Sequence, residues 1–147
     1  MRLIIQRVQK ASVAKVETNE IVGRIDKGLF ILFGVKKADT VKQAEVLAEK
    51  VIKLRIMADD KDKMNFSIKD VESQILVVSQ FTLYANTKDG NRPSFIDAAL
   101  PDDAVKIYEH FIQKLKSLGV KVETGSFGDY MKIDCVLDGP VTIILEN

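Results

Sequence analysis

The centre of the sequence reads Ile75-Leu76-Val77-Val78-Ser79-Gln80-Phe81-Thr82, four apolar residues that run directly into Ser79 and Gln80. A short continuous apolar run favours a strand that is buried on both faces of a sheet. Gly28 opens a second run of this kind, from Leu29 to Phe33. We therefore expect these two runs to be buried strands, with the polar group at the end of one of them.

The segments on either side predict further strands and two helices. One helix is expected to begin after Asp39, because Thr40 and Gln43 have the spacing of a capping box. The other is expected after Pro101, with Asp102 as its N-cap and Gly119 at its C-terminus. Strands are predicted at residues 3–8, 12–17, 21–25, 131–137 and 141–145, and polar loops at 59–65 and 86–93. This order predicts a mixed α/β domain and not a regular doubly wound sheet.

Composition limits the possible partners. The chain has 147 residues, 46% apolar and 29% charged, so we expect one soluble globular domain over residues 1–147. Its net charge of +1 is unlike that of a protein that binds many phosphates, so any RNA contact should be small, such as one strand end. The same near-neutral charge leads us to expect no DNA partner. We expect no membrane partner, because no apolar run approaches the roughly 18 residues of a span. A cytoplasmic location is the simplest interpretation.

The residues that usually carry catalysis or bind metals are scarce. His110 is the only histidine and Cys135 the only cysteine, so we expect no internal disulfide, no metal site and no cofactor. His110 is predicted on the exposed side of the second helix, where a serine-histidine-acid triad is not expected. Cys135 is predicted to be a small buried core residue. No phosphate loop or dinucleotide fingerprint is present.

The segment Ser79 to Thr82 is the first candidate site. Polar side chains at the end of a buried strand stand at a sheet edge, where ligands often bind. Exposed backbone N–H groups at such a place can hold a carbonyl oxygen or an oxyanion. A strand that simply ends in a polar turn accounts for the same residues equally well.

The segment Asp138-Gly139-Pro140-Val141-Thr142 is the second candidate, because it interrupts an otherwise long strand from Met131 to Leu145. Proline cannot donate to a sheet ladder, so a central strand cannot run through it. The segment is predicted to be a rigid, protruding bend, and the sequence leaves the isomer of the Gly139–Pro140 bond open. On these residues alone, a hairpin turn is the favoured interpretation.

Together these segments resemble the two signature motifs of the D-aminoacyl-tRNA deacylases, at Ser79-Gln80-Phe81-Thr82-Leu83 and Gly139-Pro140-Val141-Thr142. Four more segments fit the family in the same order, namely Gln6-Arg7-Val8, Lys63-Met64-Asn65, Asn91-Arg92-Pro93-Ser94-Phe95 and Thr124-Gly125-Ser126-Phe127. The resemblance covers essentially all 147 residues. Each motif alone is weak, but their joint order and spacing are specific.

The resemblance implies a tRNA-binding proofreading hydrolase. Such an enzyme cleaves the ester between a D-amino acid and the 3′-terminal adenosine of tRNA, and it also acts on glycyl-tRNA, including glycine mischarged on alanine tRNA. It implies a barrel-like, β-rich domain with two main helices that forms a homodimer, with two sites at the subunit interface.

The resemblance also implies a role for particular residues of this chain. Ser79, Gln80, Phe81 and Thr82 would form the catalytic group. Through a cis bond, Gly139 and Pro140 of one subunit would close the site of the other, and Arg7 would help to orient that bend. Other substrate-binding positions would be Phe127 against the terminal adenine, with Met131 and Ala99 in the pocket wall.

The implied arrangement suits discrimination between mirror-image substrates. An apolar pocket distinguishes one methylene by only about 1–3 kcal/mol, so excluding every L-side chain needs a rigid backbone wall. Glycine has no side chain for such a wall to reject. In the family, the 2′-hydroxyl of the terminal ribose is thought to assist the attack, whereas an older interpretation makes Thr82 the nucleophile. No base stands near Thr82 in the sequence, which favours positioning and backbone stabilisation.

Two positions depart from the family pattern. Leu137 stands where many members have Asn, and Asp129 where Ala is common. They bear on the fine shape of the adenine site and on the contacts that support the wall. Two alternatives stay open at the level of sequence. One is a dimeric RNA-end binding protein without catalysis, and the other is a related deacylase with a trans Gly139–Pro140 bond and relaxed chirality.

Overall fold

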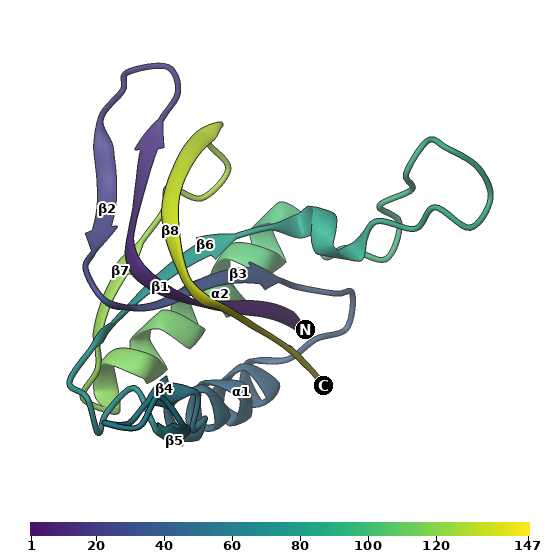
Figure 1. Ribbon diagram of the computed structural model, residues 1–147. Coiled ribbons are helices and arrows are strands. Elements are labelled where there is room, and N and C mark those ends of the chain that lie inside the picture. Colours follow the sequence, from purple (N-terminus) through teal and green to yellow (C-terminus); the bar gives the residue numbers. More distant parts are fainter.

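The computed structural model describes residues 1–147 and contains two long helices set against a strongly bent sheet (Figure 1). In chain order the elements are β1 (Arg2–Lys15), β2 (Ile21–Ile25), β3 (Gly28–Gly34), α1 (Val41–Lys53), β4 (Met57–Ala58), β5 (Met64–Phe66), β6 (Gln74–Ser79), the short 3₁₀ helix η1 (Phe81–Tyr84), α2 (Pro101–Ser117), β7 (Lys121–Thr124) and β8 (Met131–Glu146).

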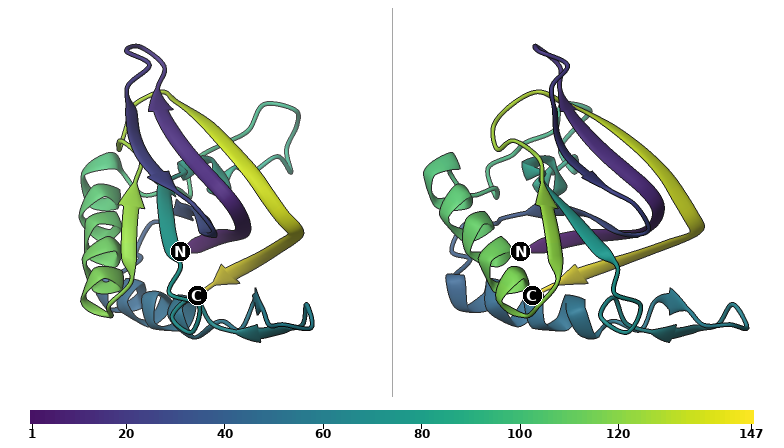
Figure 2. Two further views of the ribbon diagram at one scale, coloured as in Figure 1. Left: turned by 60° about the vertical axis from the view of Figure 1, so that its left-hand side comes forward. Right: turned by 90° about the vertical axis from the view of Figure 1, so that its left-hand side faces the viewer.

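The main sheet runs in the order β2-β1-β3-β6-β7, and β8 pairs with the remaining edge of β1. The β3–β6 and β6–β7 pairs are parallel, whereas the others are antiparallel. At the far side, β2 approaches β7 so closely that a Cβ on Gly23 would clash with the Thr124 carbonyl oxygen. The sheet therefore curls into a nearly closed barrel (Figure 2), and the prediction of a mixed, barrel-like sheet is confirmed.

The two buried runs take the expected central places. Residues 75–78 are the buried part of β6, and residues 29–33 lie in β3, its parallel neighbour. The strands expected at 3–8 and 12–17 are in fact one strand, β1. That prediction was wrong because Lys10 and Ala11 continue the pairing with Val136 and Cys135 of β8 through the polar stretch.

The prediction of two strands separated at Gly139–Pro140 was also wrong, since β8 runs from Met131 to Glu146. Thr142 pairs with Gln6 and Leu137 with Val8, so residues 138–141 bulge out opposite Arg7 alone. A bulge of this kind bends a strand without ending it, and β8 pairs only with β1, so its other edge needs no N–H from Pro140. The segment does form a bend, but it is not a hairpin turn.

Both helices begin near the expected positions. Thr40 caps α1, and the reciprocal capping box with Gln43 is present as predicted. The N-cap of α2 is Leu100 and not Asp102, because Pro101 occupies the first helical position, where no N–H is needed. Gly119 follows the helix with φ +85°, as its expected role at the C-terminus requires.

The helices contact each other at a steep angle and bury the larger part of the core against the sheet (Figure 2). Phe33 of β3 packs against Phe111 of α2 with ring centroids 4.5 Å apart. A smaller cluster around Val8, Phe30 and Val78 fills the barrel, and half-buried Cys135 packs against it. The predicted loop 86–93 is the tip of an arm that projects beyond η1 (Figure 1). In the loop predicted at 59–65, the last two residues, Met64 and Asn65, belong to β5.

Candidate functional site

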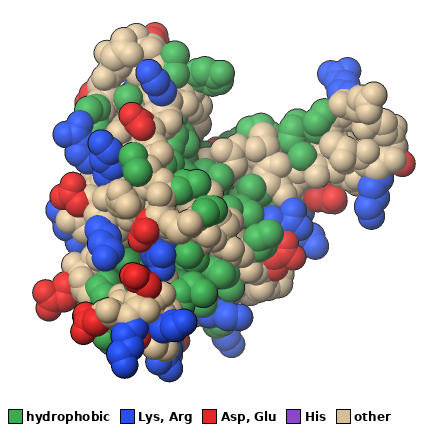
Figure 3. All heavy atoms as spheres, viewed as in Figure 1, with side chains coloured by type: hydrophobic (Ala, Val, Ile, Leu, Met, Phe, Trp, Pro, Cys, Tyr) green, Lys and Arg blue, Asp and Glu red, His purple; other side chains and the backbone are tan.

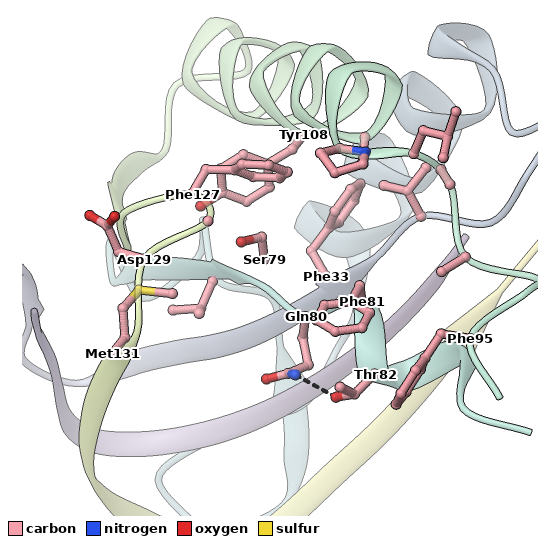
Figure 4. Close-up of a pocket in the computed structure, with 18 of the residues that line it drawn as sticks. Phe33, Ser79, Gln80, Phe81, Thr82, Phe95, Tyr108, Phe127, Asp129 and Met131 are labelled. Atoms are coloured by element: carbon pink, nitrogen blue, oxygen red, sulfur yellow. Dashed lines mark hydrogen bonds between the residues drawn. The ribbon is translucent and has the colours of Figure 1, made fainter. Parts of the chain in front are cut away.

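A cavity of about 790 Å³ opens where β6 ends, and Ser79, Gln80, Phe81 and Thr82 all line it (Figure 4). The Gln80 N–H still donates to the Phe33 carbonyl of β3 at 2.8 Å, and the chain then turns into η1. The first candidate segment therefore forms a wall of the pocket and is not only a polar turn at the end of a strand.

The wall carries two backbone donors with no partner in the chain. The N–H groups of Phe81 and Thr82 stand at the start of η1 and donate to no protein acceptor, which is the usual state of the first residues of a helix. The rest of η1 is held in place, because Leu83 N–H donates to Gln80 O and Arg2 Nη1 donates to Leu83 O at 2.6 Å. Free donors on a fixed backbone suit a carbonyl oxygen that gains negative charge.

Thr82 has no base within reach. Its hydroxyl oxygen accepts a hydrogen bond from the Gln80 side-chain amide (Figure 4). An amide N–H cannot take up a proton, so this contact orients Thr82 without activating it. The polar side chains of the segment are thus arranged for positioning.

Phe127 and Met131 form the opposite wall. The Phe127 ring lies 5.8 Å from that of Tyr108, whose hydroxyl donates to the Val77 carbonyl at 2.8 Å. Burial raises the pKa of Tyr108 well above its ordinary value, so it stays a neutral donor. The Met131 sulfur accepts the Ser126 N–H and would lie 2.8 Å from a Cβ at position 125, where the chain has glycine. These contacts fix the loop that presents the Phe127 ring.

Lys37 and Asp129 are the only charged residues in the lining. The Asp129 carboxylate accepts from the Ser126 hydroxyl at 2.6 Å and pairs with Lys15 Nζ at 2.9 Å. The Ser126 hydrogen bond first, and then Lys15, hold the pKa of Asp129 below its ordinary value. The carboxylate therefore ties the Phe127 loop to the end of β1. The remaining lining of the pocket is largely apolar, which suits an aminoacyl group or a base.

The third side of the pocket is the segment that leads into α2. Ala99 lies there, and its N–H donates to the Val35 carbonyl at 3.0 Å. Phe95, Ile96 and Leu100 add large side chains that stay exposed. The exposed Phe81 ring stacks edge-on against Phe95, with centroids 5.1 Å apart. Large exposed apolar side chains that gather in this way indicate a surface that contacts another molecule.

The second candidate segment lies elsewhere. Gly139 and Pro140 are exposed, their peptide bond is cis, and neither they nor Arg7 line the pocket. Gly139 has φ +121°, and a Cβ there would lie 2.8 Å from Val141 Cγ2 and 3.5 Å from Arg7 Nη2. The bend therefore needs glycine at this position for both its backbone angle and its space.

Arg7 is nearly buried beneath the bend. Its Nη1 donates to the Ile56 carbonyl at 2.9 Å, and its Nε lies 2.9 Å from Asp138 Oδ2. The Nε–H does not point at the carboxylate, so this contact is an ion pair and not a hydrogen bond. Arg7 thus joins the residue before Gly139 to the chain after α1.

The structure brings Ser79, Gln80, Phe81, Thr82, Phe127, Met131 and Ala99 together and sets Arg7, Gly139 and Pro140 apart as a second group. Sequence reasoning did not single out Phe33 and Tyr108 as pocket residues. The helical spacing predicts Tyr108 on the inner face of α2, but only the fold shows that this face reaches the pocket. Asp129 stands out in the sequence only as a departure from a pattern.

The histidine and the cysteine lie outside the site. His110 Nε2 is 2.8 Å from Glu45 Oε1 and links α2 to α1. Burial raises the pKa of the Cys135 thiol, so it stays protonated in the ordinary range. No group of three or more His, Cys, Asp or Glu side chains is arranged to hold a metal ion, and neither helix is long and apolar enough to cross a membrane.

Comparison with known proteins places these features in a family. The family model described as D-Tyr-tRNA(Tyr) deacylase matches residues 4–146. A D-aminoacyl-tRNA deacylase of Thermosipho melanesiensis is 49% identical, and one of Clostridium botulinum is 50% identical; each comparison covers 100% of this chain and 97% of the relative.

Two solved structures share the fold of this chain. The c-Myc DNA Unwinding Element Binding Protein is similar with a TM-score of 0.93 and 35% identity, over 100% of this chain and 99% of that one. A probable eukaryotic D-amino acid tRNA deacylase shares the fold alone, with a TM-score of 0.83 at 16% identity over 98% and 97% of the two chains. The chain therefore belongs to the D-Tyr-tRNA(Tyr) deacylase family and is a hydrolase of that kind.

Proposed function

We propose that this chain forms a homodimer that hydrolyses D-aminoacyl-tRNA and glycyl-tRNA, including glycine mischarged on alanine tRNA, and that it rejects L-aminoacyl-tRNA by a bend supplied in trans. Residues 1–147 would act as one deacylase domain. The observation that carries the proposal is the separation of the two motifs. Seven candidate residues line one pocket, whereas Gly139 and Pro140 of the same chain lie outside it and are exposed to solvent.

The pocket has the size and lining that the substrate end requires. Its volume of about 790 Å³ falls within the range of sites for small ligands, which are mostly apolar with a few polar groups. We assign the terminal adenine to the side of Phe127, where an aromatic ring is available for stacking. The aminoacyl group then lies toward η1, with Met131 and Ala99 in the wall.

The chemistry rests on backbone donors. The ester carbonyl accepts from the free N–H groups of Phe81 and Thr82, which stabilise the oxyanion as water adds. The bond from the carbonyl carbon to the ribose 3′-oxygen then breaks, and that oxygen takes up a proton, so free tRNA and the free amino acid leave. The 2′-hydroxyl of the same ribose is the nearest group of the substrate that can relay the proton. Ser79, Gln80 and Thr82 position the ester.

A second copy of the chain is the proposed source of the bend. β8 has an unpaired edge, and along it Ile133, Val136, Leu137 and Ile144 keep 37% to 60% of their surface exposed. Hydrophobic side chains gather on the hollowed face between the arm and the β1–β2 hairpin (Figure 3). A long apolar edge strand invites pairing with another chain. Pairing there would place one subunit's bend near the other subunit's pocket.

Such a wall explains the choice of substrate. An L-side chain would point at the backbone of Gly139 and Pro140, a D-side chain would point away, and glycine would meet nothing. The small footprint matches the net charge of +1, because the enzyme needs only the acceptor end of the tRNA. Aminoacyl-tRNA is used in translation, so we place the enzyme in the cytoplasm, where it would proofread chirality.

The test is ester loss from D-tyrosyl-tRNA, L-tyrosyl-tRNA and glycyl-tRNA-Ala under single-turnover conditions. We expect hydrolysis of the first and third, with L-tyrosyl-tRNA lost no faster than without enzyme. Equal rates on the D- and L-esters would refute the chiral wall. Binding of tRNA without hydrolysis of any ester would instead support an RNA-end binding protein.

A further inference from the structure

A second, polar cavity lies on the other side of the Phe127 loop. It has a volume of about 840 Å³ and runs between α2 and the end of β7. Thr124, Gly125 and Ser126 form one side, and Lys106, Glu109, Gln113 and Lys116 of α2 line the other. Tyr108 and Phe127 line both cavities, so the second cavity, called the α2 groove below, adjoins the pocket that we assign to the substrate end.

The α2 groove holds cations that nothing in the chain neutralises. Of the three lysines of α2, Lys114 pairs with Glu49 of α1 at 2.9 Å, whereas Lys106 and Lys116 make no ion pair. Both are exposed. Glu109 is the one acidic side chain in the lining, and it pairs with neither lysine. His110, at the margin, is engaged with Glu45. The groove therefore offers two free ammonium groups against one carboxylate.

The spacing of the two lysines fits an extended anion. They are ten residues apart on one helix, which at 1.5 Å per residue is about 15 Å along the axis. Eight of the twelve residues that line the groove are not hydrophobic, which is unlike a surface that docks another protein through an apolar core. A negatively charged strand with polar edges suits it better.

Geometry also leaves this direction free for the rest of the tRNA. The apolar rim at Phe95, Ile96 and Leu100 and the exposed edge of β8 are the surfaces that we assign to the second copy. With the adenine beside Phe127, the tRNA nucleotides that precede it must leave the pocket on a side that the partner subunit does not cover. The α2 groove adjoins Phe127, and no residue of the rim or of β8 lines it.

We infer that the α2 groove binds the single-stranded 3′ tail of tRNA, with Lys106 and Lys116 on phosphates of the nucleotides that precede the terminal adenosine. The inference rests on the proposed function for the position of the adenine. It adds a binding site and two residues that act on substrate recognition, not on the bond that breaks.

The experiment compares two substrates with and without the tail. Lys106→Gln/Lys116→Gln is assayed on D-tyrosyl-tRNA and on D-tyrosyl-adenosine, which lacks every preceding nucleotide. We expect KM for the tRNA to rise at least ten-fold with kcat unchanged, and no change on D-tyrosyl-adenosine. The slope of log(kcat/KM) against log salt should become shallower by about 0.7 for each phosphate that the variant no longer binds.

The matched control is Lys42→Gln/Lys50→Gln, which removes two exposed, unpaired lysines of α1 and the same net charge. It should leave both substrates unaffected. An equal loss in the control pair, an equal loss on D-tyrosyl-adenosine, or no loss on tRNA would each overturn the inference. If the unaltered protein hydrolyses no D-aminoacyl ester, the proposed function fails. In that case, the affinity of the protein for uncharged tRNA is compared with its affinity for tRNA that lacks the 3′ tail. Only a preference for the intact tail that disappears in Lys106→Gln/Lys116→Gln supports the inference there, and equal binding of both RNAs overturns it.

Discussion

Arg7 Nε lies 2.9 Å from Asp138 Oδ2, and this ion pair joins the middle of β1 to the residue that precedes the Gly139–Pro140 bend. Arg7 is nearly buried, with 11% of its side chain exposed, and Asp138 retains 26%. The guanidinium also donates to the Ile56 carbonyl. The exposed bend is therefore held from beneath by a side chain of the neighbouring strand.

Arg7→Met should loosen the bend and destabilise the fold. Removing Arg7 leaves the partly buried Asp138 carboxylate and the Ile56 carbonyl without this partner, so we expect a loss of roughly 1–3 kcal/mol in the free energy of unfolding. Urea unfolding measures this, and D- against L-tyrosyl-tRNA hydrolysis measures the selectivity, which should fall. Arg24→Met removes an arginine that makes no ion pair and should cost less than about 0.5 kcal/mol. Unchanged selectivity in a folded Arg7→Met protein would show that Arg7 is not needed to position the bend.

Thr82→Ala should keep most of the activity. Its hydroxyl accepts from the Gln80 amide and has no base beside it, so its loss should lower the single-turnover rate by roughly ten-fold or less. Loss of a true nucleophile lowers kcat by roughly a million-fold. Thr87→Ala, in the arm, is the control. A fall approaching the million-fold scale, without a fall in the control, would restore Thr82 as the nucleophile.

Phe127→Ala should weaken substrate binding more than turnover. Stacking of one base on an aromatic ring contributes about 1–3 kcal/mol, which corresponds to a rise in KM of roughly five- to 150-fold. Because Phe127 packs on Tyr108, Phe127→Leu serves as a comparison that keeps apolar bulk without the ring. It should show most of the same rise in KM. Unchanged KM in both variants would place the adenine elsewhere.

Tyr84→Phe should make the fold more resistant to alkali. Burial, with a smaller contribution from Asp39, raises the pKa of Tyr84 to about 12. The unfolded chain ionises near pH 10, so this group's contribution is intact below about pH 10 and is lost as the pH rises toward 12. Urea unfolding at pH 8.5 and 11 measures the loss, which should be smaller in Tyr84→Phe. An equal loss in both proteins would contradict the assignment.

Local patterns predicted much of the fold. The buried runs in β3 and β6, the capping box at Thr40 and the glycine after α2 all depend on neighbours within a few residues. The errors arose where distant partners decide the outcome. β1 continues through Gln9 and Lys10 because β8 pairs with it, and β8 continues through Pro140 because its outer edge is free.

The candidate site was predictable in its motifs but not in its shape. Ser79 to Thr82 stand out locally, since polar residues follow a buried strand. Phe33 and Tyr108, by contrast, come from segments 75 residues apart in the chain and meet only in the folded protein, where their rings lie 5.9 Å apart. The pairing of Arg7 with Asp138 is likewise a product of the β1–β8 register. No local pattern could show that the two motifs of one chain lie apart.

That separation makes mixed dimers the most direct test of the bend acting in trans. One chain carries Gly139→Ala, which forces a side chain into a backbone with φ +121° and a contact of 2.8 Å with Val141, and keeps its pocket. The other carries Ala99→Trp, which fills its pocket, and keeps its bend. Dimers that hold one of each, isolated with two different affinity tags, are assayed on D- and L-tyrosyl-tRNA beside the Gly139→Ala homodimer. If the bend acts in trans, the intact pocket receives the intact bend, and the D over L selectivity that the Gly139→Ala homodimer lacks returns in the mixed dimer. If the mixed dimer keeps the selectivity of the Gly139→Ala homodimer, the bend does not act on the pocket of the other subunit.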